Sequence, residues 1–257
     1  TATQAANGNY TSGTKTAALT VSTIAPTISS LIVPTKNYND VAFELMEPTS
    51  NSAGAFTYTS SNTAVATITG TTVTIVGAGT STITATQVAN GNYSSGSTTA
   101  SLAVSKASST ITATGATLYV YNGLVQGPAN SSVTGSTGDI TYSYSGIGST
   151  TYVSSVIPPI TVGTYQVIAT VAADANYSES SSEALAFTIE KAQLTITANA
   201  QYKFEGTSFS FLNNEFMVDG LMDGDVVSAT SLICLGSDVS ATAIGSPYTI
   251  SISDAVG

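Results

Sequence analysis

Short runs in which apolar and polar residues alternate recur along the chain, and they are separated by turn residues such as Gly, Asn and Pro. Alternation with a period of two predicts β-strands that bury one face. The clearest series lies between residues 24 and 105. The strands expected there are residues 28–33, 41–45, 56–60, 65–69, 73–76, 81–86 and 98–105. This pattern predicts an all-β fold of the sandwich type.

A long repeat is superimposed on these strands. Residues 1–22 match residues 84–105, which lie 83 positions later, at 16 of 22 aligned positions, and a weaker third copy covers residues 169–177. The first two copies share an Asn-Gly pair, which is a strong hairpin signal because both residues accept a positive φ. A long fixed period indicates an array of similar domains. We therefore expect a tandem array of β-sandwiches that forms an extended rod.

The repeat predicts where the domains begin and end. Residues 1–23 correspond to the C-terminal hairpin of a truncated repeat, 24–105 and 106–190 to two domains, and 191–257 to a third domain that is truncated before its closing strand. A two-stranded hairpin is marginally stable alone, so we expect a preceding domain to complete the first part. The joins between domains contain no Gly/Ser-rich spacer, which predicts limited bending.

Two motifs in the best-defined domain carry a resemblance. Ser-x-Asn-x-x-Val-Ala occupies residues 60–66, and Gly-x-Gly-x-x-x-Ile-x-Ala occupies residues 77–85. Together they resemble the bacterial immunoglobulin-like group 2 repeat. The resemblance covers most of residues 24–105 and implies an immunoglobulin-like sandwich.

The following domains resemble other modules of large secreted surface proteins of Bacteroidota. Residues 106–190 resemble one such module through a Tyr-Asn-Gly turn at 121–123 and an Asp-Ala-Asn-Tyr turn at 174–177. Residues 193–257 resemble the MBG or YDG repeat through the Gly-Leu-x-x-Gly-Asp segment at 220–225. The usual Lys-x-Tyr-Gly of that repeat is replaced by Lys-Phe-Glu-Gly at 203–206.

Charge excludes several classes of partner. The formal net charge is −10, only 8% of residues are charged, and the five basic residues are all lysine. Such a chain lacks the patch of basic residues that binds a phosphate backbone, so we expect no nucleic-acid binding. Its acidity also repels anionic membrane surfaces, and no membrane insertion is expected in this segment. The 80 Ser and Thr residues accompany 42% hydrophobic residues, which is enough to build cores.

The residue inventory argues against an enzyme. Histidine is absent, so the usual general base of a Ser or Cys hydrolase is missing. No pair of carboxylates is placed as a glycosidase requires. Cys234 is the single cysteine, which excludes an intrachain disulfide, and we expect it to be a small buried core residue. We predict no catalytic residues and no bound organic cofactor.

Calcium is the one cofactor that the sequence suggests. Asp219, Asp223 and Asp225 lie within seven residues that include two glycines, and hard cations bind several oxygens in a turn. The spacing does not match an EF-hand, and a solvated acidic turn is the alternative. Three Asn-Tyr-Ser/Thr triplets, which begin at Asn9, Asn92 and Asn176, fit the N-glycosylation rule, but a turn Asn followed by a packing Tyr explains them as well.

The resemblance implies a structural role. It predicts a stalk or spacer segment of a giant cell-surface adhesin, outside the cell, in a group linked to type 9 secretion and gliding motility. Its partners would be neighbouring domains of the same longer chain, and another region would bind a glycan or protein target. The alternative is a subunit of a phage fibre or extracellular filament assembled by strand exchange. A carbohydrate-binding module would need an exposed aromatic platform, and the chain has no Trp.

Overall fold

The computed structural model describes residues 1–222, 224–227 and 229–256. The protein is all-β, and its described helices are two short 3-10 turns. The chain divides into two compact units. Unit 1 comprises Thr1–Ser109, Gly135–Gly138 and Ala173–Glu179, and unit 2 comprises Thr110–Thr134, Asp139–Ala172 and Ser180–Gly257. The domain boundaries expected from the repeat stay predictions.

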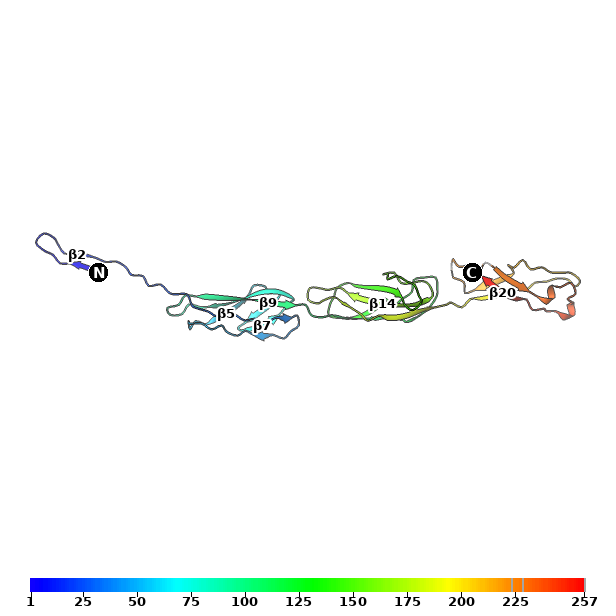
Figure 1. Ribbon diagram of the computed structural model, residues 1–257, viewed down its shortest axis with the longest axis horizontal. Coiled ribbons are helices and arrows are strands. Elements are labelled where there is room, and N and C mark those ends of the chain that lie inside the picture. Colours follow the sequence, from blue (N-terminus) through cyan, green and yellow to red (C-terminus); the bar gives the residue numbers. More distant parts are fainter. Residues whose placement is uncertain (223, 228, 257) are drawn as a thin grey trace. The chain divides into compact units, whose positions relative to one another are not determined.

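Unit 1 contains a β-sandwich, in which Figure 1 labels β5, β7 and β9. One sheet has the order β3-β9-β8-β5 and the other has the order β4-β7-β6. The strands are β3 (Lys36–Asn37), β4 (Phe43–Glu44), β5 (Phe56–Ser60), β6 (Ala66–Thr69), β7 (Thr72–Ile75), β8 (Gly79–Gln87) and β9 (Gly96–Ser105). All pairs are antiparallel except β3 with β9.

The core of this sandwich follows from the alternation in its strands. On β8, Ser81, Ile83, Ala85 and Gln87 are buried, whereas the residues between them are exposed or half-buried. Ile83 and Leu102 of the first sheet join one apolar cluster with Val73 of the second. The two sheets therefore bury facing apolar residues, as the period of two predicts.

One expected strand is wrong. Residues 28–33 form no strand, and only an isolated bridge links Ile28 to Ser50. The backbone N–H of Ser29 donates to the Thr49 carbonyl, but the Thr49 N–H donates back to the Ser29 hydroxyl instead of to a carbonyl. The Ser29 hydroxyl thus takes the hydrogen bond that a backbone carbonyl would accept in a regular strand pair, and the pairing ends at this point. Leu31 still points into the core.

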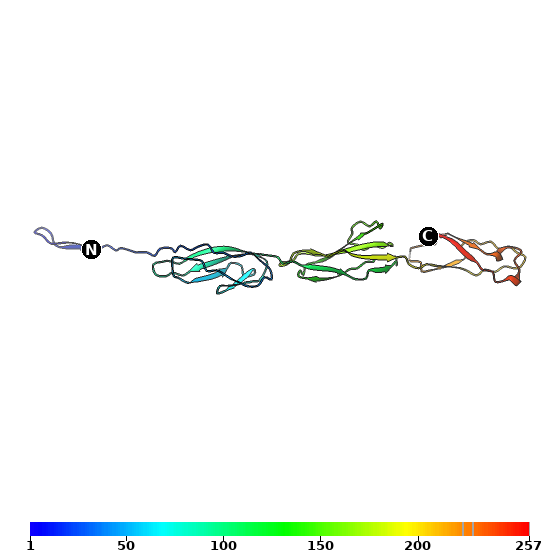
Figure 2. The same cartoon turned by 60° about the horizontal axis from the view of Figure 1, so that its bottom comes forward.

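The N-terminal residues form a separate hairpin within unit 1. β1 (Ala2–Gln4) pairs with β2 (Gly13–Lys15), and both strands appear in blue in Figure 2. Every residue from 1 to 23 is exposed. The hairpin therefore has no buried apolar face of its own.

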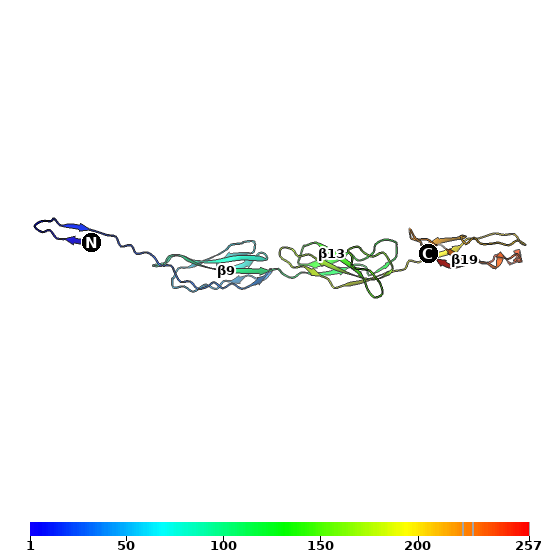
Figure 3. The same ribbon diagram turned by 45° about the horizontal axis from the view of Figure 1, so that its top comes forward.

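Unit 2 contains a second sandwich, in which β13 is labelled in Figure 3. One sheet pairs β10 (Thr110–Thr114) with β12 (Asn130–Thr134). The other has the order β11-β16-β14-β13, with β15 beside β14. Its strands are β11 (Leu118–Val120), β13 (Ile140–Gly146), β14 (Gly163–Val171), β15 (Ser180–Ser181) and β16 (Leu185–Glu190).

The core of the second sandwich is aromatic. Tyr165 and Val167 on β14 are fully buried and join Tyr144, Phe187 and Ile111 in one cluster. The Tyr165 and Phe187 rings stack with centroids 5.5 Å apart, and the Tyr144 ring meets Phe187 edge-on at 6.2 Å. This cluster is separate from the one in unit 1, so each sandwich has its own core.

The last part of unit 2 consists of two hairpin-like pairs and the two 3-10 turns. β17 (Thr195–Ala198) pairs with β18 (Phe216–Asp219), and β19 (Ala229–Ile233) pairs with β20 (Ser251–Val256). The turns are η1 (Leu235–Ser237) and η2 (Ala243–Gly245). Leu232 is buried, whereas Phe204 and Ile244 are 86% and 98% exposed. Apolar burial is therefore sparse in this part.

Candidate functional site

A four-residue turn occurs in all three copies of the repeat. Its first N–H donates to its fourth carbonyl. The bonds run from Asn7 to Tyr10 (3.0 Å), from Asn90 to Tyr93 (3.1 Å) and from Asp174 to Tyr177 (3.1 Å). The third residue is Asn and the fourth is Tyr each time. The turn expected at these triplets is present in all three places, but its Tyr does not always pack, because Tyr10 is 68% exposed.

In the third copy, a carboxylate organises the turn. Asp174 Oδ1 accepts the N–H groups of Asn176 (2.9 Å) and Tyr177 (2.8 Å), and its Oδ2 accepts the N–H and hydroxyl of Thr137. These bonds, led by the one from the Thr137 N–H, lower the pKa of Asp174 from its ordinary 3.8 to about 2. Hydrogen bonds to a charged carboxylate favour that charged form. Lys106 Nζ donates to the Asp174 carbonyl.

The Tyr of this turn contacts the end of the sandwich in unit 1. The Tyr177 ring meets the Tyr38 ring edge-on, with centroids 5.4 Å apart and planes at 85°. The Tyr177 hydroxyl accepts a hydrogen bond from Asn39 Nδ2 at 2.8 Å. Asn39 adopts a φ of 72°, which an Asn tolerates better than most residues. The ring contact and the hydrogen bond together give this Tyr a defined position.

The Asn of the turn contacts the same end of that sandwich. Asn176 Oδ1 accepts the backbone N–H of Ala78 at 2.9 Å. A Cβ on Gly77 would stand 2.6 Å from the Ala64 carbonyl oxygen and 3.2 Å from Asn176 Oδ1. Glycine at this position therefore leaves room for the Asn176 amide. Because the Ala78 N–H lies outside any strand pair, the side chain satisfies a donor that the sheet leaves open.

Backbone bonds hold the turn from its other side. The Ala107 N–H donates to the Asn176 carbonyl (2.9 Å), and the Ser178 N–H donates to the Ala107 carbonyl (2.9 Å). Tyr177 and Ala107 thus form a parallel bridge. These bonds attach the turn to the chain at Ala107.

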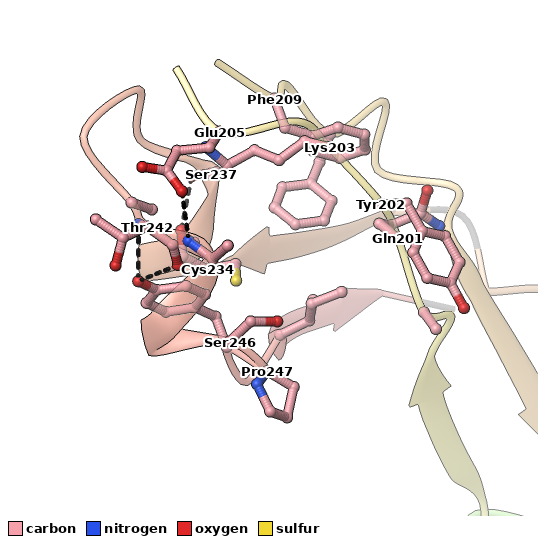
Figure 4. Close-up of a pocket in the computed structure, with 17 residues that line it drawn as sticks. Gln201, Tyr202, Lys203, Glu205, Phe209, Cys234, Ser237, Thr242, Ser246 and Pro247 are labelled. Atoms are coloured by element: carbon pink, nitrogen blue, oxygen red, sulfur yellow. Dashed lines mark hydrogen bonds between the residues drawn. The ribbon is translucent and has the colours of Figure 1, made fainter. Parts of the chain in front are cut away.

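A cavity of about 470 Å³ lies in the last part of unit 2 (Figure 4). Phe209 and Phe211 line it as an edge-on pair, 5.1 Å between centroids. The Ala243 N–H donates to Glu205 Oε2 at 3.0 Å. Tyr202 belongs to the lining and is 91% exposed. These aromatic side chains were not singled out from the sequence, because nothing in the alternation distinguishes them from core residues.

Cys234 also lines this cavity (Figure 4), so its expected burial in a core is wrong. The side chain is half-buried and reduced. β19 ends at Ile233 and η1 begins at Leu235, so Cys234 lies where the chain leaves the sheet. That position explains the partial exposure.

The calcium prediction concerns Asp219, Asp223 and Asp225, and Asp223 lies outside the described residues. Asp219 ends β18, and Asp225 Oδ2 accepts a hydrogen bond from the Tyr121 hydroxyl at 3.4 Å. Within the described ranges, no three His, Cys, Asp or Glu side chains gather as a metal site would require. Calcium binding therefore stays a prediction.

No helix in the described part of the chain has the length and apolar character needed to cross a bilayer.

Comparisons with known proteins reveal distant structural likenesses. No family model and no curated protein match the chain. Three solved structures are similar to it at TM-scores of 0.24–0.25: EC1-3 and EC1-4 of Drosophila N-cadherin (both 11% identical), and a SusE-like surface-located polysaccharide-binding protein from the heparin utilisation locus of Bacteroides thetaiotaomicron (9% identical). The alignment with EC1-3 covers 65% of this chain and 68% of that one, and the alignment with EC1-4 covers 84% and 64%. The alignment with the SusE-like protein covers 67% of this chain and 36% of that one. Likenesses this weak carry no functional argument.

Proposed function

We propose that this chain is a structural stalk or spacer segment of a large repetitive adhesin on a bacterial cell surface. Its partners are neighbouring domains of a longer chain, and a distal region binds the glycan or protein target. The observation that carries the proposal is the turn at Asp174–Tyr177, the third copy of a repeated motif, whose side chains form hydrogen bonds with the end of the sandwich in unit 1.

Two further observations support a mechanical role. Each sandwich has its own apolar core, so each resists unfolding without needing a ligand. The surface is rich in hydroxyl groups and poor in charge, with a formal net charge of −10, which limits nonspecific association. An extracellular location, secretion by a type 9 system and a part in gliding belong to this proposal, on the basis of the sequence resemblance alone.

One observation favours the strand-exchange alternative. Leu19 and Val21 occupy alternate positions outside any described strand and are 90% and 87% exposed. Such a segment could pair with an open sheet edge of another copy, as donor strands do.

Sedimentation velocity of the chain over a wide concentration range, with and without calcium, separates the two functions. The stalk predicts a monomer whose frictional ratio exceeds that of a globular protein and does not change with concentration. Concentration-dependent polymers would overturn the stalk and favour the filament. A frictional ratio that rises only with calcium would instead add an ion-dependent stiffening to the stalk.

A further inference from the structure

We infer that the cavity of about 470 Å³ in the last part of unit 2 is a carbohydrate-binding site (Figure 4). Tyr202, Phe209 and Phe211 meet the C–H face of a sugar ring, and the Glu205 carboxylate accepts hydrogen bonds from its hydroxyl groups. The inference goes beyond the proposed stalk, in which another region binds the target, and it does not depend on that proposal.

Aromatic side chains give the cavity its apolar surface. The Phe209 and Phe211 rings lie edge-on with centroids 5.1 Å apart, and both side chains are half-buried. The Tyr202 side chain lines the same cavity and is 91% exposed. These three residues lie outside both apolar clusters that form the cores of the sandwiches. Their rings therefore offer a ligand a large apolar contact area at little cost in conformational entropy, although the chain has no Trp.

A fourth aromatic side chain, Tyr248, is held in the cavity wall. Its hydroxyl donates to the Thr242 carbonyl and accepts a hydrogen bond from the Thr242 N–H, both at 3.2 Å. A Cβ on Gly236 would stand 2.7 Å from Tyr248 Cβ, so glycine at that position leaves room for the ring. This part of the wall is thus formed before a ligand binds, which reduces the entropy lost on binding.

The charges around the cavity select a neutral ligand. Lys203 Nζ donates to the carbonyls of Thr207 (2.8 Å) and Asp238 (2.7 Å), and its positive charge disfavours a cation. Glu205 lines the same cavity, and its negative charge disfavours an anion. A purely apolar ligand would take both charged groups out of water without new hydrogen bonds, which costs free energy. A neutral molecule with hydroxyl groups on an apolar frame, such as a sugar, satisfies all three conditions.

The Glu205 carboxylate supplies the acceptor for these hydroxyl groups. Its Oε2 accepts the Ala243 N–H at 3.0 Å, whereas its Oε1 accepts no hydrogen bond from the residues that the structure describes. One oxygen thus fixes the side chain and the other is available. Hydrogen bonds from hydroxyl groups to a carboxylate are roughly twice as strong as those between neutral groups. The volume of the cavity, about 470 Å³, lies in the range of small-molecule sites.

The test is a titration of the whole chain with simple sugars, followed by saturation-transfer difference NMR. The probes are the methyl glycosides of glucose, galactose, mannose, fucose and N-acetylglucosamine, each added separately up to tens of millimolar. The methyl glycoside of N-acetylneuraminic acid, an anion, is the probe that should not bind. Phe204→Ala is the matched control variant, because Phe204 is 86% exposed but does not line the cavity.

We expect at least one neutral glycoside to bind with a Kd in the millimolar range. Tyr202→Ala should weaken that binding about tenfold through loss of the ring face. Glu205→Gln should weaken it about tenfold as well, because hydrogen bonds to a charged acceptor are lost. Phe204→Ala should leave the Kd unchanged. Both site residues are exposed, and unchanged thermal unfolding of the two variants would show that the fold is kept.

The outcomes separate the site from the proposed function. If none of the neutral glycosides binds, or if Tyr202→Ala and Glu205→Gln leave the Kd unchanged, the site is overturned, and the stalk stands as long as the chain sediments as an elongated monomer. A chain that polymerises, but whose sugar binding weakens in these two variants, would overturn the stalk and support the site.

Discussion

The amide oxygen of Asn176 accepts a hydrogen bond from the backbone N–H of Ala78, which lies 98 positions earlier in the chain, at 2.9 Å. Its neighbour Tyr177 meets Tyr38 and Asn39 at the same place. A turn that looks local in the sequence is therefore a long-range contact.

The Tyr177 hydroxyl and the Asn39 amide should be energetically coupled. Tyr177→Phe removes the acceptor, and Asn39→Gly removes the donor while tolerating the φ of 72°. We expect a coupling free energy of about 0.5–1 kcal/mol, since each single variant already loses the bond. A double-mutant cycle by urea unfolding measures it, and strictly additive effects would contradict the contact.

The carboxylate of Asp174 should make stability depend on acid pH. Its folded pKa of about 2 lies below the ordinary 3.8, so the stabilisation is complete above the higher value and is lost as the pH falls through the lower one. Asp174→Asn should therefore melt at a lower temperature than the natural protein at about pH 6, and the difference should shrink toward about pH 2. Glu179→Gln removes the same charge from an exposed residue and should show no such convergence.

Replacing Gln87 should destabilise the sandwich of unit 1. It is 1% exposed, its amide donates to the carbonyls of Ser52 and Gly54, and its oxygen accepts from the Ser50 hydroxyl. Gln87→Leu keeps the bulk but leaves buried carbonyls unpaired, which we expect to lower the free energy of unfolding by about 2–4 kcal/mol. Gln166→Leu, at a half-buried position, is the control and should cost far less. Equal losses in urea unfolding would refute this role.

Two tyrosines whose hydroxyl groups are buried should respond oppositely to loss of that hydroxyl. The Tyr58 hydroxyl is buried without a partner among the described residues, and burial raises the pKa of that phenol. Tyr58→Phe should leave stability unchanged or raise it by up to about 1 kcal/mol. The Tyr144 hydroxyl donates to the Pro128 carbonyl at 2.8 Å, so Tyr144→Phe should cost about 1–2 kcal/mol. Calorimetry of both variants checks the contrast in sign.

The alternation in the sequence predicted much of the fold. Residues 56–60 form β5 as expected, and the strands expected at 81–86 and 98–105 lie within the longer β8 and β9. Apolar and polar residues alternate along these strands with a period of two, so a single sequence shows which face of each strand is buried. β3 was not predicted, because a two-residue parallel strand leaves no alternation to detect.

The candidate site was predictable only in part. The three Asn-Tyr turns follow from the repeat, and the structure confirms them. What Tyr177 touches could not be predicted, because its partner Asn39 lies 138 positions away and no local pattern reports such a contact. The recurrence of Tyr-Asn at 38–39 and 121–122, 83 positions apart, was a signal that could have drawn attention to Tyr38 and Asn39.

The central claim is that independently folded domains carry load along the chain, and stretching single molecules by their two ends tests it most directly. Residues 24–105 and 106–190 should unfold in separate events. A fully extended chain spans about 3.3–3.6 Å per residue, so each unfolded domain should span roughly 300 Å. The gain in length at each event should be this value minus the length of the folded domain. Phe187→Ala should lower the force of one event and leave the other unchanged, because the two cores are separate. Extension with no force-resisting event, or one event that includes both sandwiches, would contradict the account.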